Sequence, residues 1–269
     1  MNEIEIAKRA AIEAGQVIKT YFSHVGYKLK GRANPVTLAD IKSQEIIAKK
    51  IRKTFPKDSI IAEEGLMSIM DKKRLWIVDP LDGTVNFTHN FPHFAVSISF
   101  VENGVVKLGI IYDPMKNEFF KAIKDKGAFL NGKKIVVSKT KKLSDSLLAT
   151  GFAYDRREKA DFYCSFYSHF LKISHDIRRC GAASLDMAYV ACGRIDGYWE
   201  FNLKPWDVAA GKLIVEEGGG KVSDFSGKSW KKDFNSILKW GKETLVCNFK
   251  IKLEMLRHIK SLSKILIKT

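Results

Sequence analysis

The most informative run in this chain is Trp76-Ile77-Val78-Asp79-Pro80-Leu81-Asp82-Gly83-Thr84. Its first residues are apolar, which is typical of a buried strand. Pro80 cannot donate a ladder hydrogen bond and Gly83 permits a sharp turn, so we expect the strand to stop here. Carboxylates that would diverge on a continuing strand can converge at such a turn. Asp79 and Asp82 are therefore candidate ligands of a hard cation, Mg²⁺ or Mn²⁺ rather than zinc.

Taken alone, the same stretch can also be an ordinary turn, because Asp-Pro and Asp-Gly steps are common turn formers that bind nothing. Two other regions favour the cation site. Residues 59–62 read as a short strand that ends at Glu63 and Glu64. Pro205-Trp206-Asp207 begins an apolar-periodic helix with an acid in its first turn. We therefore expect acids from three separate elements to gather at one place.

These residues resemble the signature sequences of the inositol monophosphatase family. That family belongs to a larger group of Mg²⁺-dependent, lithium-sensitive phosphomonoesterases, which includes the fructose-1,6-bisphosphatases. The first signature covers residues 76–87 (WIVDPLDGTVNF) and the second covers 206–220 (WDVAAGKLIVEEGGG). Between them, Gly181-Ala182-Ala183-Ser184 and Gly197-Tyr198-Trp199-Glu200 follow in the family's order and spacing. The resemblance runs from about Ala7 to the C-terminal helix.

The resemblance implies two metal ions held by oxygen ligands, with Mg²⁺ as the natural ion and a third ion left open. Such a pair activates water for an in-line displacement at phosphorus, so no covalent nucleophile is required. Thr84 and Asp40 would orient the attacking water, and Glu63 joins them as a catalytic residue. The metal ligands that the resemblance implies are Glu63, Asp79, the Leu81 carbonyl, Asp82 and Asp207.

The resemblance also implies how a substrate would bind. The phosphate would rest on the Gly83 and Thr84 amides at the start of a helix. Glu200 resembles the family acid that accepts a hydrogen bond from a substrate hydroxyl. The substrate-binding residues that we expect are Asp82, Gly83, Thr84, Gly181, Ala182, Ala183, Glu200, Asp207, Arg178 and Arg179.

Substrate choice stays open between two classes. A polyol phosphate, inositol-1-phosphate first, fits the acid at Glu200. Fructose-1,6-bisphosphate is the close competitor, because Arg178 and Arg179 can hold a second phosphate. These arginines can equally form a solvated or intersubunit basic patch, and Glu200 can be an exposed acid at a strand end. Hydrolysis of the monoester is the expected reaction in either case.

Two positions leave the pattern incomplete. Val85 stands where many members carry a second threonine, which removes one hydroxyl from the phosphate loop. The family also has a lysine before the loop that leads to Asp40, and Lys28 and Lys30 are both candidates for it.

Length and composition agree with an enzyme. The chain has 269 residues, 45% of them hydrophobic, which is enough for a large core. The four cysteines show no metal-binding pair spacing, so we expect free thiols. His89 and His93 are four residues apart without an HExxH string, which favours surface or packing roles. Without a signal peptide or a long apolar run, we expect a cytoplasmic protein that does not enter a membrane.

The net charge of +16 suggests a second class of function, because such an excess attracts polyanions. The short basic runs at 139–142 and 228–232 lack the repeated aromatic side chains of a nucleic-acid stacking surface. A member of this family can act as a transcription-associated factor in bacteria. RNA or RNA polymerase binding is therefore the non-enzymatic alternative.

Periodicity predicts helices at about 4–21 and 38–55, followed by a mainly antiparallel sheet. After residue 147, short strands alternate with helices at about 155–173, 182–192, 206–217 and 249–267. The resemblance implies a mixed α/β fold, a layered αβαβα sandwich with the site in the cleft between the halves. We expect residues 1–145 and 146–269 to be two lobes of one catalytic unit, and family members are mostly homodimers.

Overall fold

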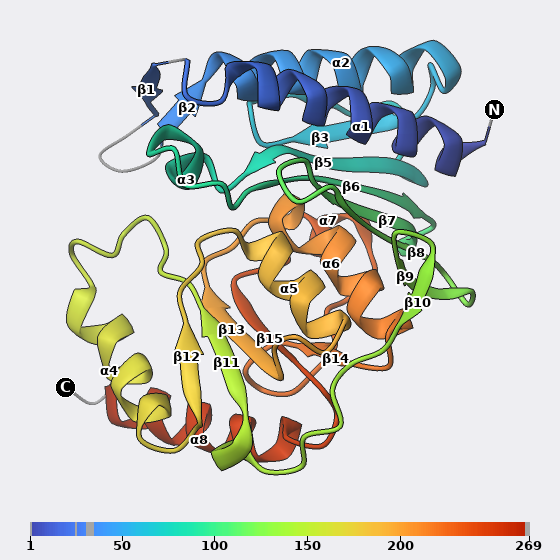
Figure 1. Ribbon diagram of the computed structural model, residues 1–269. Helices are drawn as coiled ribbons and strands as arrows, with labels where there is room; N and C mark the ends of the chain where they lie inside the picture. The colour runs from blue at the N-terminus through green and yellow to red at the C-terminus, as the bar shows by residue number, and fades with distance from the viewer. Residues whose placement is uncertain (1, 25, 31–34, 267–269) are drawn as a thin grey trace.

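The computed structural model describes residues 2–24, 26–30 and 35–266, and its elements stack in alternating layers of helices and strands (Figure 1). Two long helices cover a large sheet, a second pair lies between this sheet and a smaller one, and a third pair covers the smaller sheet. The predicted αβαβα sandwich is confirmed. The helices are α1 Glu3–Tyr21, α2 Leu38–Thr54, α3 Thr84–Thr88, η1 Leu143–Asp145, α4 Ala160–Leu171, α5 Ala183–Ala191, α6 Pro205–Glu217, α7 Phe234–Ile237 and α8 Lys252–Leu266.

The first half of the chain builds the larger sheet and a two-stranded ribbon. Their strands are β1 Tyr27–Leu29, β2 Pro35–Thr37, β3 Ser59–Ala62, β4 Met67–Ser68, β5 Arg74–Asp82, β6 Ala95–Glu102, β7 Val105–Asp113, β8 Glu118–Ile123, β9 Gly127–Leu130 and β10 Lys133–Ile135. The sheet has the order β10-β9-β8-β7-β6-β5-β3-β4, and its neighbours are antiparallel except for β3 and β5. The prediction of a mainly antiparallel sheet is confirmed.

Strand β5 continues further than the sequence predicts. Its ladder with β6 breaks after Asp79 and resumes at Asp82, which pairs with Ala95. Pro80 lacks a donor, so the chain bulges at this point instead of ending the strand. The expectation that the strand stops was therefore wrong. The bulge still brings Asp79 and Asp82 to the same cavity, as expected of a turn at this position.

The second half of the chain builds the smaller sheet, in the order β12-β11-β13-β15-β14. Its strands are β11 Leu147–Thr150, β12 Asp176–Arg178, β13 Gly197–Phe201, β14 Lys221–Ser223 and β15 Glu243–Cys247. The predicted helices are all present, although α4 and α8 begin later than expected. The boundary between lobes at residue 145 stays a prediction. Among the described residues, no helix has the length and apolar character needed to cross a membrane.

Helix α6 runs between the two sheets and is almost wholly buried. A side chain on Gly109 of β7 would lie 2.6 Å from the Ala210 carbonyl oxygen, so this glycine lets the helix approach the larger sheet closely. The first turn of α6 carries Asp207. Close packing thus fixes the distance between that acid and the bulge in β5.

Candidate functional site

A cavity of about 240 Å³ lies where the bulge of β5 meets the beginnings of α3, α5 and α6 and the end of β13. Most of the residues predicted from sequence line it. Those residues are Glu63, Asp79, Leu81, Asp82, Gly83, Thr84, Arg179, Gly181, Ala183, Glu200 and Asp207. The fold therefore gathers side chains that lie far apart in the sequence.

Glu63, Asp79, Asp82 and Asp207 form what we call the acidic cluster. Asp79 and Asp82 are buried, and the other two are half-buried. Burial raises the pKa of Glu63 to about 7 and that of Asp82 to about 6. Burial and then the neighbouring carboxylates raise the pKa of Asp79 and of Asp207 well above the ordinary value. A cation bound among such crowded carboxylates would strongly favour their ionised form.

Backbone and hydroxyl groups fix the orientation of these acids. The Leu81 amide donates to Asp79 Oδ1 at 3.0 Å, and the Lys204 amide donates to Asp207 Oδ2 at 2.6 Å. Asp82 Oδ2 accepts from the amide of Ser184, at 2.7 Å, and from its hydroxyl. The family resemblance implies no role for Ser184. The structure shows that it holds Asp82 from the first turn of α5.

Thr84 and Asp40 are brought together, but only Thr84 reaches the cavity. Thr84 Oγ1 lies 3.0 Å from both Asp40 Oδ1 and the Leu81 carbonyl oxygen. Asp40 is fully buried behind it, where the Thr37 amide donates to Asp40 Oδ2 at 2.8 Å. Burial raises the pKa of Asp40 to about 6. In this arrangement Asp40 can act on a water molecule in the cavity only through the Thr84 hydroxyl.

Lys30, and not Lys28, reaches the site. Lys30 Nζ lies 3.1 Å from Glu63 Oε1 and 2.7 Å from Glu64 Oε1, and the residue lines the cavity. Lys28 is exposed on β1. Spacing alone could not separate the two lysines, because their order in the chain does not say which one faces Glu63.

Gly83 precedes α3 with a φ of 94°, in the left-handed region that favours glycine. A side chain there would also lie 3.0 Å from the His93 carbonyl oxygen. Gly83 and Thr84 both line the cavity, so their backbone is exposed to a bound ligand. Since α3 has only five residues, the amides rather than a long helix dipole would contact a phosphate.

The opposite wall carries Glu200, at the end of β13. It is buried rather than exposed, which rules out the reading of a solvated acid at a strand end. Tyr198 donates a hydrogen bond to Glu200 Oε2, and burial raises the pKa of Glu200 to about 7. Arg156 and Arg179 line the same cavity, and the Arg179 guanidinium lies 5.7 Å from the Phe152 ring centre. A polar molecule with hydroxyls and a second anionic group would find partners here.

Two predicted substrate residues are not brought to the cavity. Arg178 is exposed, and its Nη1 lies 2.5 Å from Asp176 Oδ2 on the same strand. Arg178 is the last residue of β12, whereas Arg179 lies in the loop that leads to α5, and only Arg179 lines the cavity. Ala182 precedes α5 and packs inside the protein. The prediction of substrate contacts by these two side chains is not supported by the geometry.

Sequence reasoning missed the segment between β11 and α4. Gly151, Phe152, Tyr154 and Arg156 line the cavity. This loop has no metal-ligating pattern, and its position depends on the pairing of β11 with β13. A resemblance built on acids and glycines gave no signal for it.

Comparison with known proteins gives consistent results. The sequence profile of the inositol monophosphatase family matches residues 2–259. Nus factor SuhB of Escherichia coli K12 is 43% identical over 228 residues, which cover 83% of this chain and 85% of that protein.

Solved structures are similar over nearly the whole chain. An inositol monophosphatase (IMPase) from Thermotoga maritima superposes with a TM-score of 0.88 at 36% identity, covering 98% of this chain and 99% of the other. An IMPase/NADP phosphatase solved with Mg²⁺ and phosphate gives a TM-score of 0.78 at 25% identity, covering 91% and 90%.

Proposed function

Because the chain belongs to the inositol monophosphatase family, we propose that it is a Mg²⁺-dependent phosphomonoesterase of small polyol or sugar phosphates. Inositol-1-phosphate is the first expected substrate. One observation carries the proposal: four acids from β5, α6 and the end of β3 face a single cavity. We further propose that the enzyme is a cytoplasmic homodimer.

The residues present fit a hard divalent ion. Glu63, Asp79, Asp82, Asp207 and the Leu81 carbonyl offer only oxygen atoms, which are the ligands that Mg²⁺ and Mn²⁺ prefer. The Mg²⁺ in the solved IMPase/NADP phosphatase supports the same choice. Divalent ions held here would supply charge stabilisation for a phosphoryl group and lower the pKa of a water molecule. We propose two such ions.

The chain's own groups can position the reactants around that centre. The Thr84 hydroxyl, oriented by Asp40, can hold a water molecule toward the phosphorus. The Gly83 and Thr84 amides can donate hydrogen bonds to the phosphate oxygens. Glu200, as a carboxylate, can accept a hydrogen bond from a hydroxyl of the alcohol part. The raised pKa of Glu200, about 7, predicts that this contact weakens as the pH falls below neutral.

The proposal is tested by Asp82→Asn. We expect turnover of inositol-1-phosphate to fall by orders of magnitude, because the amide cannot supply the anionic oxygen that a divalent ion requires. The measurement is phosphate release against Mg²⁺ concentration, with circular dichroism to establish folding. Asp125→Asn is the control, since this surface aspartate lies outside the cavity. Unchanged Mg²⁺-dependent turnover in a folded Asp82→Asn variant contradicts the proposal.

Fructose-1,6-bisphosphate is the second candidate substrate, favoured by the two arginines in the cavity wall. We expect Arg179→Gln to lower kcat/KM for the bisphosphate by about tenfold or more and to affect inositol-1-phosphate less. Arg178→Gln is a matched control, because the neighbouring arginine pairs with Asp176 outside the cavity. If kcat/KM falls equally for both substrates, Arg179 has a general role in binding or catalysis and no longer favours a bisphosphate substrate.

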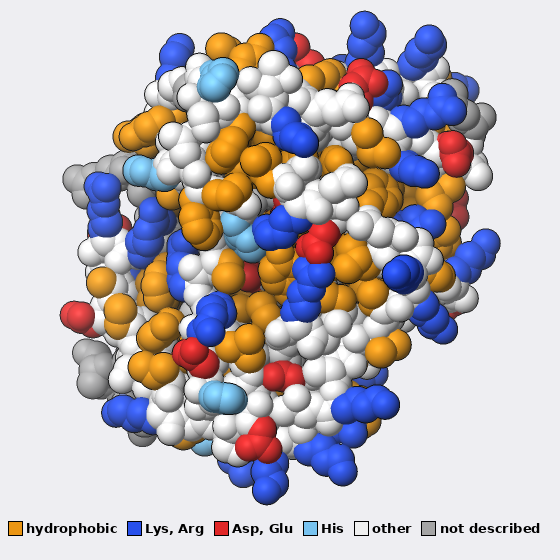
Figure 2. All heavy atoms as spheres, viewed as in Figure 1, with side chains coloured by type: hydrophobic (Ala, Val, Ile, Leu, Met, Phe, Trp, Pro, Cys, Tyr) orange, Lys and Arg blue, Asp and Glu red, His pale blue; other side chains and the backbone are white. Residues whose placement is uncertain are grey.

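Transcription-associated binding is the non-enzymatic candidate, favoured by relatives named as Nus factors and by the net charge of +16. On the face shown in Figure 2, Lys and Arg side chains are spread around the molecule rather than gathered in one patch. Trp230, inside the basic run 228–232, packs against Trp240 with ring centres 5.6 Å apart. Retention on RNA by the Asp82→Asn variant at moderate salt would support this function separately from catalysis.

A further inference from the structure

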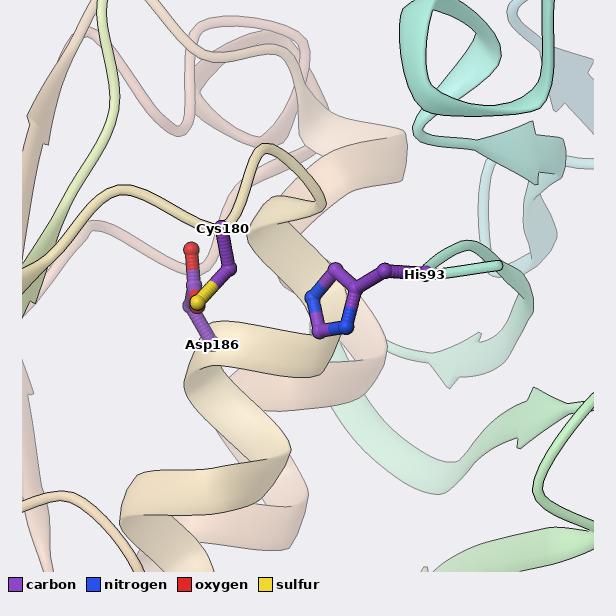
Figure 3. Close-up of side chains that lie close together, drawn as sticks. All are labelled: His93, Cys180 and Asp186. Atoms are coloured by element: carbon purple, nitrogen blue, oxygen red, sulfur yellow. The ribbon is translucent and has the colours of Figure 1, made fainter. Parts of the chain in front are cut away.

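His93, Cys180 and Asp186 form a second group of ligand-type side chains, which we call the mixed cluster (Figure 3). His93 lies in the loop before β6, Cys180 lies in the loop before α5, and Asp186 lies in the first turn of α5. One atom from each side chain, a ring nitrogen, a sulfur and a carboxylate oxygen, lies within 4.8 Å of the other two. None of the three lines the cavity of the acidic cluster.

Two buried polar atoms in the mixed cluster have no hydrogen-bond partner. They are His93 Nε2 and Asp186 Oδ1. His93 is 8% exposed and Asp186 is 1% exposed, so bulk solvent has little access to these atoms. In Figure 3 the imidazole edge faces the Cys180 sulfur and the Asp186 carboxyl. Unpaired buried polar atoms destabilise a folded protein, so their convergence favours a site for a bound ligand.

The backbone around the mixed cluster is already held in place. The Asn86 side-chain amide donates to the His93 carbonyl at 2.8 Å and to the Cys180 carbonyl at 2.9 Å. It thereby joins the two loops that supply the nitrogen and sulfur. The Asp186 amide donates to the Ala182 carbonyl at 3.0 Å, which fixes the turn that supplies the carboxylate. The His93 ring packs edge-on against Tyr189. Such supports orient ligands before an ion arrives.

We propose that the mixed cluster is a binding site for a borderline transition-metal ion, with Zn²⁺ as its representative. Thiolate, imidazole and carboxylate are the zinc ligands of proteins, and three of them with a water molecule complete a tetrahedron. The two anionic ligands neutralise a divalent ion, which suits a buried site. Mg²⁺ does not compete here, because it avoids sulfur and nitrogen.

Binding requires proton loss and a small contraction. The thiol proton of Cys180 leaves to solvent, and burial raises the pKa of Asp186 well above its ordinary value, so its proton leaves as well. Burial lowers the pKa of His93 to about 4, which leaves the imidazole neutral and able to donate its lone pair. Ligand atoms on one zinc ion are roughly 3.5 Å apart, so the side chains move inward slightly from their present separation. Cys180 is half-buried and offers the entry path.

The mixed cluster shares a helix turn and a loop with residues next to the acidic cluster. Asp186 and Ser184 lie in the same turn of α5, and Ser184 holds Asp82. Cys180 directly precedes Gly181, which lines the cavity. A metal ion here would cross-link the two loops and the start of α5, and so stabilise the folded state.

The first test uses Co²⁺, whose bond to a thiolate gives a charge-transfer band in the near ultraviolet. With excess Mg²⁺ present to occupy the acidic cluster, we expect one equivalent of Co²⁺ to produce this band in the wild-type chain. Cys180→Ser should abolish it, and Cys164→Ser should keep it, because Cys164 is exposed and outside the mixed cluster. The absence of the band in wild type, or its persistence in Cys180→Ser, overturns the proposal.

The second test measures stability by thermal unfolding. Micromolar Zn²⁺, added with Mg²⁺ in excess, should raise the Tm of the wild type and of Cys164→Ser by several degrees, about 3 kcal/mol at a hundredfold excess over Kd. Asp186→Asn and Cys180→Ser should show no rise even where they fold normally. An equal rise in all variants would place zinc elsewhere and overturn the assignment. These tests use no phosphatase assay, so their outcome is independent of the proposed function.

Discussion

The acidic cluster and the mixed cluster are both groups of buried or half-buried titratable side chains, yet their donor atoms differ. The acidic cluster offers only oxygens, whereas the mixed cluster offers a sulfur, a nitrogen and an oxygen. This difference selects hard ions at the first and borderline ions at the second. If both proposals hold, ligand chemistry alone would keep the two ion sites of this fold apart.

The two clusters are linked through the beginning of α5. Ser184 donates to Asp82 from this turn, and Asp186 extends from it toward His93 and Cys180. The acidic cluster is open to a cavity that can take a substrate. No residue of the mixed cluster lines this cavity. The comparison suggests a catalytic role for the first cluster and a supporting role for the second, and experiments on single residues can separate these roles.

The largest effect is expected for Glu63→Gln, which removes a charge from the acidic cluster. Turnover should fall by roughly two orders of magnitude or more, since a ligand matters more than the residues that support it. Glu64→Gln is the matched control, because Lys30 pairs with both acids but Glu64 does not line the cavity. Steady-state phosphate release at saturating Mg²⁺ measures the difference. Equal losses in the two variants would break the distinction between ligand and neighbour.

A smaller effect is expected for Ser184→Ala, which removes the hydroxyl donor to Asp82 and leaves the backbone donor in place. Loss of such a supporting group lowers metal affinity or activity by about tenfold. We expect this loss to change both the apparent dissociation constant for Mg²⁺ and kcat. Ser99→Ala provides the control, because its hydroxyl lies 3.5 Å from the Ile77 carbonyl inside the larger sheet. A loss as large as that of Glu63→Gln would show that the start of α5 is itself part of the catalytic centre.

The smallest effect is expected for the dependence of folding stability on pH. The pKa values of Glu63 and Glu200 are raised to about 7, and those of Asp40 and Asp82 to about 6. Without divalent ions, the folded protein therefore binds more protons than the unfolded chain between about pH 4.5 and 7. Stability should rise as the pH falls through this window.

Thermal unfolding in a chelator measures this dependence. Adding Mg²⁺ at pH 7 should raise the Tm and flatten the pH profile, because the acids of the cluster then remain ionised in the folded state. A profile that is the same with and without Mg²⁺ would show that the raised pKa values are unrelated to ion binding.

The acids of the first cluster could be found from sequence because each sits beside a local signal. Asp79 and Asp82 flank Pro80, and Asp207 follows Pro205 in the first turn of a helix. The structure brings these residues to one cavity. The choice between Lys28 and Lys30, and between Arg178 and Arg179, had no such signal. Lys30 follows strand β1 and reaches Glu63, and Arg179 follows the end of β12 and reaches the cavity.

The mixed cluster shows more clearly what cannot be predicted from the sequence. The sequence favours a surface or packing role for His93, because His89 and His93 lack an HExxH string, and it predicts a free thiol at Cys180. Cys180 is a free thiol in the structure. The contact with Asp186 across the α5 turn, and with the loop before β6, appears only after folding.

The main helices, the sheet strands and the acids proposed to hold a hard cation can be predicted from the sequence, and the layered arrangement follows from the family resemblance. Periodic apolar residues and turn formers act locally, so their consequences can be derived from neighbours in the chain. Folding settles which basic side chains and loops share the cavity, how Asp40 contacts Thr84, and which residues form the mixed cluster. Those features depend on the packing of α5 and α6 between the two sheets, because contacts between distant segments are set by the whole fold and not by adjacent residues.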